Sequence, residues 1–417
     1  MSFFADILSS LFDRKLGLAN RVEDDNKPID ALCQALLSSR GDVSGMSLAQ
    51  LILDRYADLD DAGKLAWFSL LANDMDVPAE VAIAAIKAYQ DAPSAKNYEA
   101  MTAAVEPARL QLIRRLNQTH DATAKLVAMR EDLIRFLPEN PNLGKLNVDF
   151  KHLFVSWFNR GFLVLRPINW SSPAHILEKI ITYESVHEIE NWDDLRRRLQ
   201  PEDRRCFAFF HPAMPDEPLI FVEVALTKGI PNSIQSVLLE NRDVMAAEKA
   251  DTAAFYSISN CQAGLAGISF GNSLIKTVVQ HLLRELPQIR NFVTLSPIPG
   301  LAKWLRETGN FDADATAETH RQLAAHYLLN AKHHNGKPRD PVARFHLNNG
   351  ALVGAVHANA DKSKNGMAQS CGVMVNYHYD LSRISENHEA FANQQTVIAE
   401  KLVKTLAAEI EITDRAT

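Results

Sequence analysis

The sequence predicts a two-domain protein, with an all-α helical bundle first and a domain of mixed strands and helices after it. Length is the first reason, because 417 residues exceed what a single hydrophobic core usually holds. Periodicity is the second, since apolar residues up to about residue 158 recur only at helical spacing. The third is a change near Gly161, where short strand-like runs begin. We therefore predict domains at 1–158 and 159–417.

Amphipathic helices account for the first domain. Residues 61–74 place Leu65, Phe68 and Leu71 on one face of a helix, and residues 121–138 repeat the pattern. A helix with one apolar face buries that face against its neighbours, so a bundle is expected.

Alternating strands and helices predict an α/β second domain. A helical pattern at 271–286 lies between two strand-like runs, which is the order of a β-loop-α-β unit. One long helix at 386–411 is expected to close the domain. The strand-like runs are 162–168, 206–211, 218–226, 254–259 and 291–296.

The overall composition limits the classes of partner. The chain is 47% hydrophobic and 23% charged, as in ordinary globular proteins. Its net charge of -7 and pI of about 6.1 argue against nucleic acid or a membrane surface as a partner. No apolar run reaches the ~18–20 residues that span a bilayer. We interpret neither end of the sequence as a targeting signal.

Cysteine and histidine spacing does not predict a metal site. No C-x-x-C pair occurs, and the four thiols lie far apart, at Cys33, Cys206, Cys261 and Cys371. Scattered thiols suggest a reducing compartment, so we expect a cytoplasmic protein. Four histidines are predicted on one helix without a suitable acidic partner, namely His320, His326, His333 and His334.

A glycine-rich loop at 260–270 offers two kinds of chemistry. Residues 267–271 match G-x-S-x-G, the nucleophile elbow of serine hydrolases, with Ser269 as the nucleophile. However, the loop is longer than an elbow, and Gly264 and Gly267 would let several backbone amides converge at the start of a helix. Such a concavity binds phosphate. We favour a phosphate-binding loop, and leave the elbow and a plain loop as alternatives.

Several motifs carry a resemblance to known families. The Q-x-G-L-x-G pattern from Gln262 to Gly267 resembles the pyrophosphate loop of the GNAT (N-acyltransferase) superfamily, which grips coenzyme A. Five stretches in order resemble malonyl-CoA decarboxylases. They are FFHPAMPDEPLIFVEVAL (209–226), FYSISNCQAGLAGISFGNSLIK (255–276), LSPIPG (295–300), RFHLNNGA (344–351) and SCGVMVNYHY (370–379).

This resemblance implies a helical oligomerisation domain and a GNAT-like catalytic domain that converts malonyl-CoA to acetyl-CoA and CO2, a reaction of fatty acid metabolism. The family's catalytic residues fall on Ser296, His346 and Tyr379, with Tyr377 as the alternative tyrosine. Leu301 stands where the family pattern has phenylalanine. The expected CoA-binding residues are Gln262, Gly264, Leu265, Ala266, Gly267, Ile268, Ser269, Phe270, Gly271 and Asn272.

The chemistry of decarboxylation suits these residue types. Loss of CO2 leaves an enolate whose charge lies on the thioester oxygen, so the reaction requires no metal or organic cofactor. Ser296 would hydrogen-bond the carboxylate or relay a proton, His346 would donate to the thioester or to C2, and Tyr379 would orient one of them. The residues alone leave other interpretations open: Ser296 could open a turn, and His346 could be a packed core residue.

The local sequence also predicts the element that carries His346. Asp340, Pro341 and Gly350 read as the N-cap, first turn and C′ residue of a short helix, with an Asn-Gly hairpin as the alternative.

Other functions share part of this pattern. A GNAT acyltransferase would use the same CoA loop with an amine acceptor, a serine hydrolase would use Ser269, and a CoA-binding scaffold would have no turnover. The expected partners are malonyl-CoA and acetyl-CoA, together with further copies of the chain, as a dimer or tetramer through the helical domain.

Overall fold

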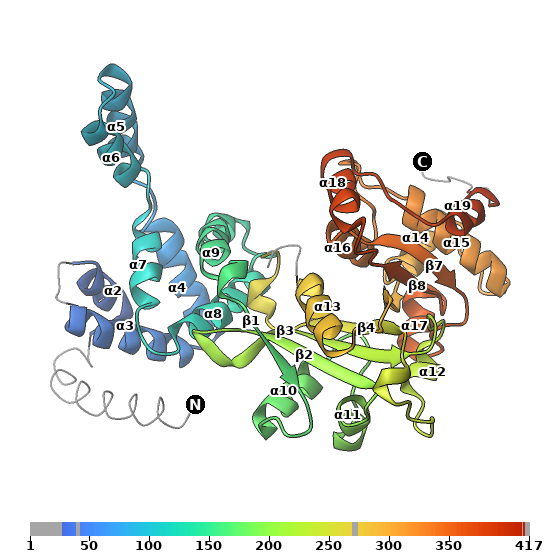
Figure 1. Cartoon of the computed structure of the whole chain (residues 1–417). Helices are drawn as coiled ribbons and strands as arrows, with labels where there is room; N and C mark the ends of the chain where they lie inside the picture. Colours follow the sequence, from blue (N-terminus) through green and yellow to red (C-terminus); the bar gives the residue numbers. More distant parts are fainter. Residues whose placement is uncertain (1–26, 39–41, 269–273, 411, 413–417) are drawn as a thin grey trace. The chain divides into compact units, whose positions relative to one another are not determined.

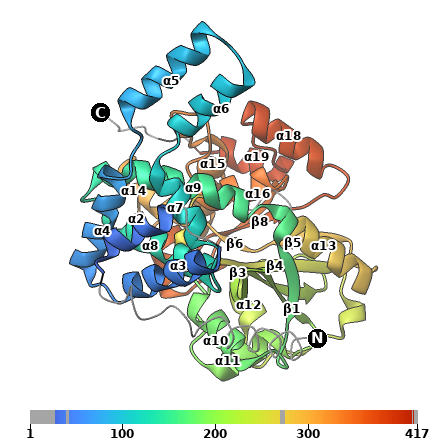
Figure 2. The same cartoon turned by 90° about the vertical axis from the view of Figure 1, so that its left-hand side faces the viewer.

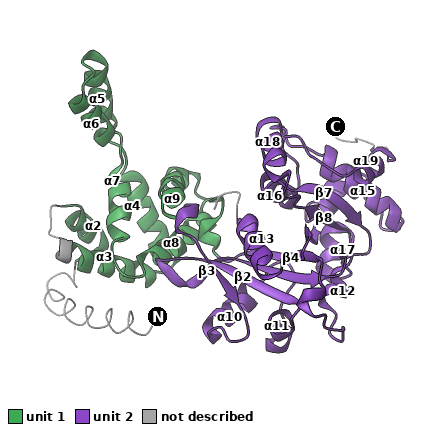
Figure 3. Ribbon diagram, viewed as in Figure 1, with its two compact units in different colours: residues 1–158, 262–268 green, residues 159–261, 269–417 purple. Residues whose placement is uncertain are grey.

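The structure is a computed structural model that describes residues 27–38, 42–268, 274–410 and 412. It divides into two compact units (Figure 3). Unit 1 contains residues 1–158 and 262–268, and unit 2 contains residues 159–261 and 269–417.

Unit 1 is helical throughout its described part. Phe68 and Leu71, which the sequence places on one helix face, are fully buried, and Leu126 and Leu133 of the later pattern join the core. The helices are α2 (Ile29–Leu37), α3 (Asp42–Ala57), α4 (Asp61–Asn73), α5 (Ala79–Asp91), α6 (Ala95–Ala104), α7 (Ala108–Leu116), α8 (Ala122–Phe136) and α9 (Gly144–Trp157), with 3-10 turns η1 (Pro141–Leu143) and η4 (Ala263–Leu265).

The α5–α6 pair differs from the rest of this unit. It extends away from the other helices of unit 1 (Figures 1 and 2). Ala82 is the buried residue of α5, and α6 has none. The rings of Tyr89 and Tyr98 meet at a centroid distance of 5.8 Å and so join the two helices.

Unit 2 is built on a mixed sheet in the order β1-β2-β3-β4-β5-β8-β6, with β7 paired to β8. All strand pairs are antiparallel except β4–β5. That parallel pair requires a crossover connection, which contains α13 (Leu274–Glu285). The strands are β1 (Val164–Ile168), β2 (Arg204–His211), β3 (Met214–Thr227), β4 (Thr252–Asn260), β5 (Asn291–Thr294), β6 (Ser296–Pro297), β7 (Leu352–His357) and β8 (Met374–His378).

Helices cover both faces of this sheet. Cys206, Ala208 and Phe210 of β2 pack in one apolar cluster with α10 and α11. Phe207 points to the opposite face because side chains alternate along a strand, and its ring meets His281 of α13 at 5.1 Å. The remaining elements are η2 (Arg160–Phe162), α10 (Ala174–Tyr183), α11 (Trp192–Leu199), α12 (Ile234–Leu238), η3 (Ala247–Lys249), α14 (Leu301–Glu307), α15 (Ala317–Asn330), α16 (Pro341–Asn348), α17 (Lys364–Ser370), α18 (Ile384–Gln394) and α19 (Lys401–Ala408).

The predicted helix at 386–411 is wrong as a single element. It is divided into α18 and α19, and Gln395 between them has a φ of 58°. The backbone of Val353 in β7 donates to Ile398 and accepts from Glu400. Pairing with β7 therefore replaces helical hydrogen bonds in this segment.

Two further predictions need correction. The strand expected at 291–296 is divided into β5 and β6, on either side of Leu295. His320 and His326 lie on α15, whereas His333 and His334 follow its end, so the four histidines do not share one helix. In the part of the chain that the structure describes, no helix is long and apolar enough to cross a membrane.

Candidate active site

Ser296 lies at the junction between β5 and β6. It begins β6, where it pairs with Val375 of β8, and only 6% of its surface is exposed. Its Oγ donates a hydrogen bond to Oγ1 of Thr294 at 2.9 Å. Thr294 Oγ1 also accepts the backbone N–H of Tyr377 at 3.0 Å. The serine hydroxyl is therefore anchored by two neighbouring strands.

His346 is carried by the short helix α16, as its flanking residues predict. The Asp340 side chain caps the helix by accepting the Ala343 N–H at 2.8 Å, and Pro341 occupies the first turn. Gly350 follows the C-cap with a φ of +83°, the left-handed conformation that glycine adopts most readily. The hairpin alternative for Asn349-Gly350 is wrong.

Ser296, His346 and Tyr379 come together within unit 2. Oγ of Ser296 is 3.3 Å from Nε2 of His346, and Nδ1 of His346 is 2.7 Å from Oη of Tyr379. Tyr379 follows β8 directly, and its backbone N–H donates to Phe292 O on β5. Residues 50 and 33 positions apart thus form one chain of hydrogen bonds.

The second tyrosine has a different contact with the imidazole. The Tyr377 ring stacks on His346 at 4.6 Å with an interplanar angle of 23°. Its hydroxyl is buried and has no hydrogen-bond partner among the described residues. Tyr379 therefore hydrogen-bonds the histidine, and Tyr377 holds the plane of its ring.

Burial determines the charge state of this group of residues. His346 is 3% exposed, and desolvation lowers its pKa to about 3. Burial also raises the pKa of Tyr379 well above its usual value. The site therefore contains a neutral imidazole and a neutral phenol at neutral pH, which favours hydrogen bonding over transfer of a full charge.

Asp340 connects the element that carries Ser296 with the element that carries His346. Its Oδ1 caps α16, and its Oδ2 accepts the N–H of Gly300, in the loop after Ser296, at 3.4 Å. The side chain is fully buried, and burial raises the pKa of Asp340 to about 6. A Cβ on Gly300 would lie 2.1 Å from Oη of Tyr327, so the close approach requires glycine.

Residues 262–268 of the predicted CoA loop belong to unit 1. Arg130 of α8 is 1% exposed, and its guanidinium donates to the carbonyls of Gly264 and Ala266. A Cβ on Gly264 would lie 1.9 Å from Val127 O, so this glycine is required by packing on α8. Gly267 has a φ of +74°.

The remaining residues of the predicted CoA loop are in part buried and in part outside the described residues. Leu265 and Ile268 are buried, and the backbone of Gln262 precedes η4. The last four predicted binding residues lie outside the described residues, namely Ser269, Phe270, Gly271 and Asn272. The structure therefore does not test the interpretation of Ser269 as a nucleophile, because this residue is not described.

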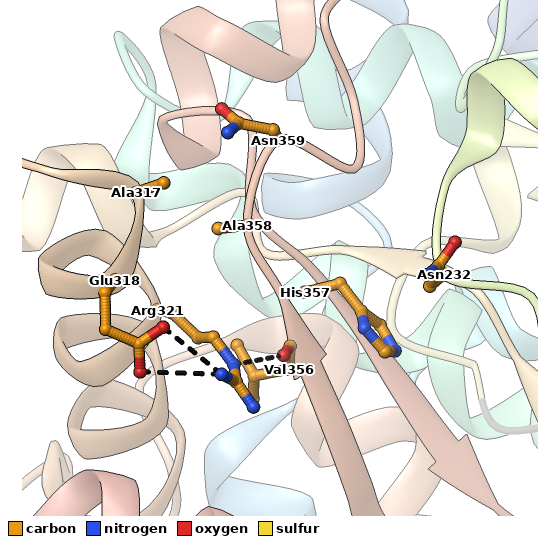
Figure 4. A pocket seen from close by; sticks show the side chains of 8 residues that line it. All are labelled: Asn232, Ala317, Glu318, Arg321, Val356, His357, Ala358 and Asn359. Carbon is orange, nitrogen blue, oxygen red and sulfur yellow. Dashed lines mark hydrogen bonds and ion pairs between the residues drawn. The ribbon is translucent and has the colours of Figure 1, made fainter.

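Unit 2 also has a surface pocket of about 340 Å³ (Figure 4). Arg321 projects into it, but its guanidinium is occupied by Glu318 and by the carbonyl of Val356. His357 in its wall contacts the amide of Asn376, which donates to Thr294 O at 2.7 Å. None of Ser296, His346 and Tyr379 lines the pocket.

Comparison with known proteins identifies the family. The sequence model of the protein family described as Malonyl-CoA decarboxylase C-terminal domain matches residues 161–320 and 308–416 of this chain. The family model for the corresponding N-terminal domain matches residues 77–158. The chain belongs to the malonyl-CoA decarboxylase family. A relative from Anser anser anser named malonyl-CoA decarboxylase, mitochondrial, is 36% identical over 351 residues, which are 72% of this chain and 69% of that protein. The Mus musculus relative of the same name is 33% identical over 359 residues, 74% of this chain and 73% of that protein.

Solved structures of this family share the fold. The malonyl-CoA decarboxylase from Rhodopseudomonas palustris is 49% identical with a TM-score of 0.85, covering 90% of this chain and 98% of that one. The Agrobacterium vitis structure is 48% identical with a TM-score of 0.86, covering 91% and 99%. The predicted family, the helical part followed by an α/β part, and the carboxy-lyase class of enzyme are confirmed.

Several residues of the site were not identified from sequence. Thr294 and Asp340 are placed by strand pairing and by a loop contact between distant segments. Arg130 belongs to a helix 134 positions from the loop that it holds. The sequence marked Asp340 as a helix cap. However, no local signal indicated that Asp340 also accepts the Gly300 N–H, or which groups Thr294 and Arg130 contact.

Proposed function

We propose that this chain decarboxylates malonyl-CoA to acetyl-CoA and CO2 at Ser296, His346 and Tyr379. The observation that carries the assignment is the continuous hydrogen-bond chain through the three side chains that match the family motifs. Membership of the malonyl-CoA decarboxylase family supports the substrate.

The reaction breaks the bond between C2 and the carboxylate carbon. The electron pair moves into the bond between C2 and the thioester carbon, charge develops on the thioester oxygen, and CO2 leaves. C2 then gains one proton, so that malonyl-CoA and H⁺ give acetyl-CoA and CO2. A hydrogen-bond donor at the thioester oxygen lowers the barrier, typically by ~2.7–4 kcal/mol for one donor.

The hydrogen-bond chain assigns a role to each group. With Tyr379 donating to Nδ1, the neutral His346 carries its proton on Nε2 and donates to Ser296 Oγ. The serine proton then points to Thr294 and can turn to the substrate oxygen. Tyr379 orients the imidazole and keeps its own proton, because burial raises its pKa.

One assay tests the proposal directly. The purified protein is incubated with malonyl-CoA alone, and the products are identified by mass spectrometry. We expect acetyl-CoA in the wild type and turnover lowered at least ~10²-fold in Ser296→Ala and His346→Asn, by analogy with loss of one oxyanion donor. Free CoA would indicate a hydrolase, and a requirement for an amine acceptor would indicate an acyltransferase; either result contradicts the proposal.

The helical unit is proposed to assemble copies of the chain into a dimer or tetramer. Apolar side chains of α5 are exposed without cover in the described unit: Val81 by 57%, Ile83 by 65% and Ile86 by 46%. Such a group of residues commonly marks a protein interface.

A cytoplasmic location is also proposed. All four cysteines are free and buried, which fits a reducing compartment.

A further inference from the structure

Lys151 of α9 lies beside the CoA loop within unit 1. A Cβ built on Gly267 would be 3.5 Å from Nζ of Lys151 and 3.6 Å from its Cε. Both residues are part of the same compact unit, in which residues 262–268 lie with the helices (Figure 3). The lysine side chain therefore lies next to Gly267, whose φ is +74°.

Neither polar group at this point has a partner among the described residues. Lys151 forms no ion pair or hydrogen bond there, and the Gly267 N–H donates to no described acceptor. Lys64 and Lys125 of the same unit, in contrast, form ion pairs with Asp132 and Asp54. An ammonium group and a backbone amide thus remain available together.

Residues 264–266 of the loop are held by hydrogen bonds within unit 1. Arg130 holds the carbonyls of Gly264 and Ala266, and its Nε donates to Oδ1 of Asn147 at 3.0 Å. This buried guanidinium thus donates three hydrogen bonds within the unit, two of them to backbone carbonyls of the loop. Lys151, in contrast, has its ammonium group next to Gly267 with no partner among the described residues.

We propose that Lys151 binds a phosphate group of the CoA moiety, together with the N–H of Gly267. The inference rests on the proposed function and names a contact for the same substrate. Ammonium and amide N–H groups are the donors that phosphate oxygens accept, and a charged donor strengthens the bond.

A charge-removing variant tests this contact. Lys151→Gln should raise the KM for malonyl-CoA about tenfold with little change in kcat, as expected for loss of a charge-assisted hydrogen bond. With malonyl-pantetheine, which lacks the nucleotide, Lys151→Gln and wild type should give equal kcat/KM. Lys151→Arg should recover most of the affinity. The matched control is Lys96→Gln, the same change at an exposed lysine of α6 in the same unit.

Two results would overturn the inference: an unchanged KM for malonyl-CoA in Lys151→Gln, or an equal loss with both substrates, which would indicate a structural role. Direct calorimetry of CoA binding separates this inference from the proposed function. If wild type binds CoA and Lys151→Gln binds it about tenfold more weakly, the contact stands even when no decarboxylation is seen. Comparison with dephospho-CoA then identifies the phosphate, because only a 3′-phosphate contact makes the two proteins bind dephospho-CoA equally.

Discussion

Nδ1 of His346 lies 2.7 Å from the hydroxyl oxygen of Tyr379, and this contact orients the buried imidazole toward Ser296. Tyr379→Phe removes the hydroxyl while keeping the ring. Because one hydrogen bond to a buried group is lost, we expect kcat to fall about tenfold with KM for malonyl-CoA unchanged. Steady-state kinetics measures both constants.

Tyr377→Phe is the matched control for that variant. The Tyr377 hydroxyl has no hydrogen-bond partner among the described residues, and its ring stacks on His346 through carbon atoms that phenylalanine retains. Its kcat should stay within about twofold of wild type. An equal loss in both variants would mean that ring packing, and not the Tyr379 hydroxyl, matters.

The low pKa of His346 predicts a flat activity profile near neutrality. Desolvation lowers this pKa to about 3, so the imidazole stays neutral above pH 5. Measured kcat should therefore show no step near pH 6.5 that comes from this histidine. A titration of the His346 imidazole near pH 6.5, followed by NMR in wild type and absent in His346→Gln, would contradict this prediction.

The same pKa predicts how stability changes with pH. The unfolded histidine takes up a proton below about pH 6.5 whereas the folded one does not, so its contribution to the free energy of unfolding falls as pH decreases from 6.5 toward 3. The slope is about 1.4 kcal/mol per pH unit in this window. Urea unfolding of wild type and His346→Gln at several pH values measures the difference; parallel pH curves would contradict it.

Asp340 offers a way to separate capping from positioning. In Asp340→Asn one amide oxygen can still cap α16, but the NH2 group cannot accept the second backbone N–H, from Gly300. We expect about a tenfold lower kcat with a Tm close to wild type. Asp340→Ala loses both contacts and should also lower the free energy of unfolding by about 1–3 kcal/mol.

Kinetics and thermal unfolding of the two Asp340 variants check this separation. Asp60→Asn is the control, since Asp60 caps α4 by accepting the Gly63 N–H and has no comparable second role among the described contacts. Wild-type kcat in Asp340→Asn would show that the Gly300 contact does not position the site.

The exposed residues of α5 predict an effect on assembly. Ile83 is 65% exposed, so Ile83→Asp should leave the fold intact and place a charge in the proposed interface. Light scattering after size-exclusion chromatography should show an oligomer for wild type and a smaller species for the variant. The same change at exposed Ile230, outside the helical unit, should leave the mass unchanged. If Ile83→Asp forms an oligomer of the same mass as wild type, α5 is not part of the interface.

Much of the site was predictable because its signals are local. The Asp340 and Pro341 pair and Gly350 set the ends of α16 through backbone conformation, and the helix was predicted with these bounds. The family motifs likewise marked Ser296 and His346 from short runs of sequence. The choice between Tyr377 and Tyr379 could not be made, because residues two apart near a strand face the same side.

The sequence by itself determined the division into a helical and an α/β part and the family, and it marked the side chains that we propose to react. Tertiary structure decided which of them touch, because Ser296, His346 and Tyr379 meet only through strand pairing with β8 and the docking of α16. It also ended α18 at Gln395, where pairing with β7 outweighs helix propensity. In both cases the deciding hydrogen bonds join segments that are distant in sequence. Local residue patterns cannot predict such bonds, because each partner lies outside the pattern.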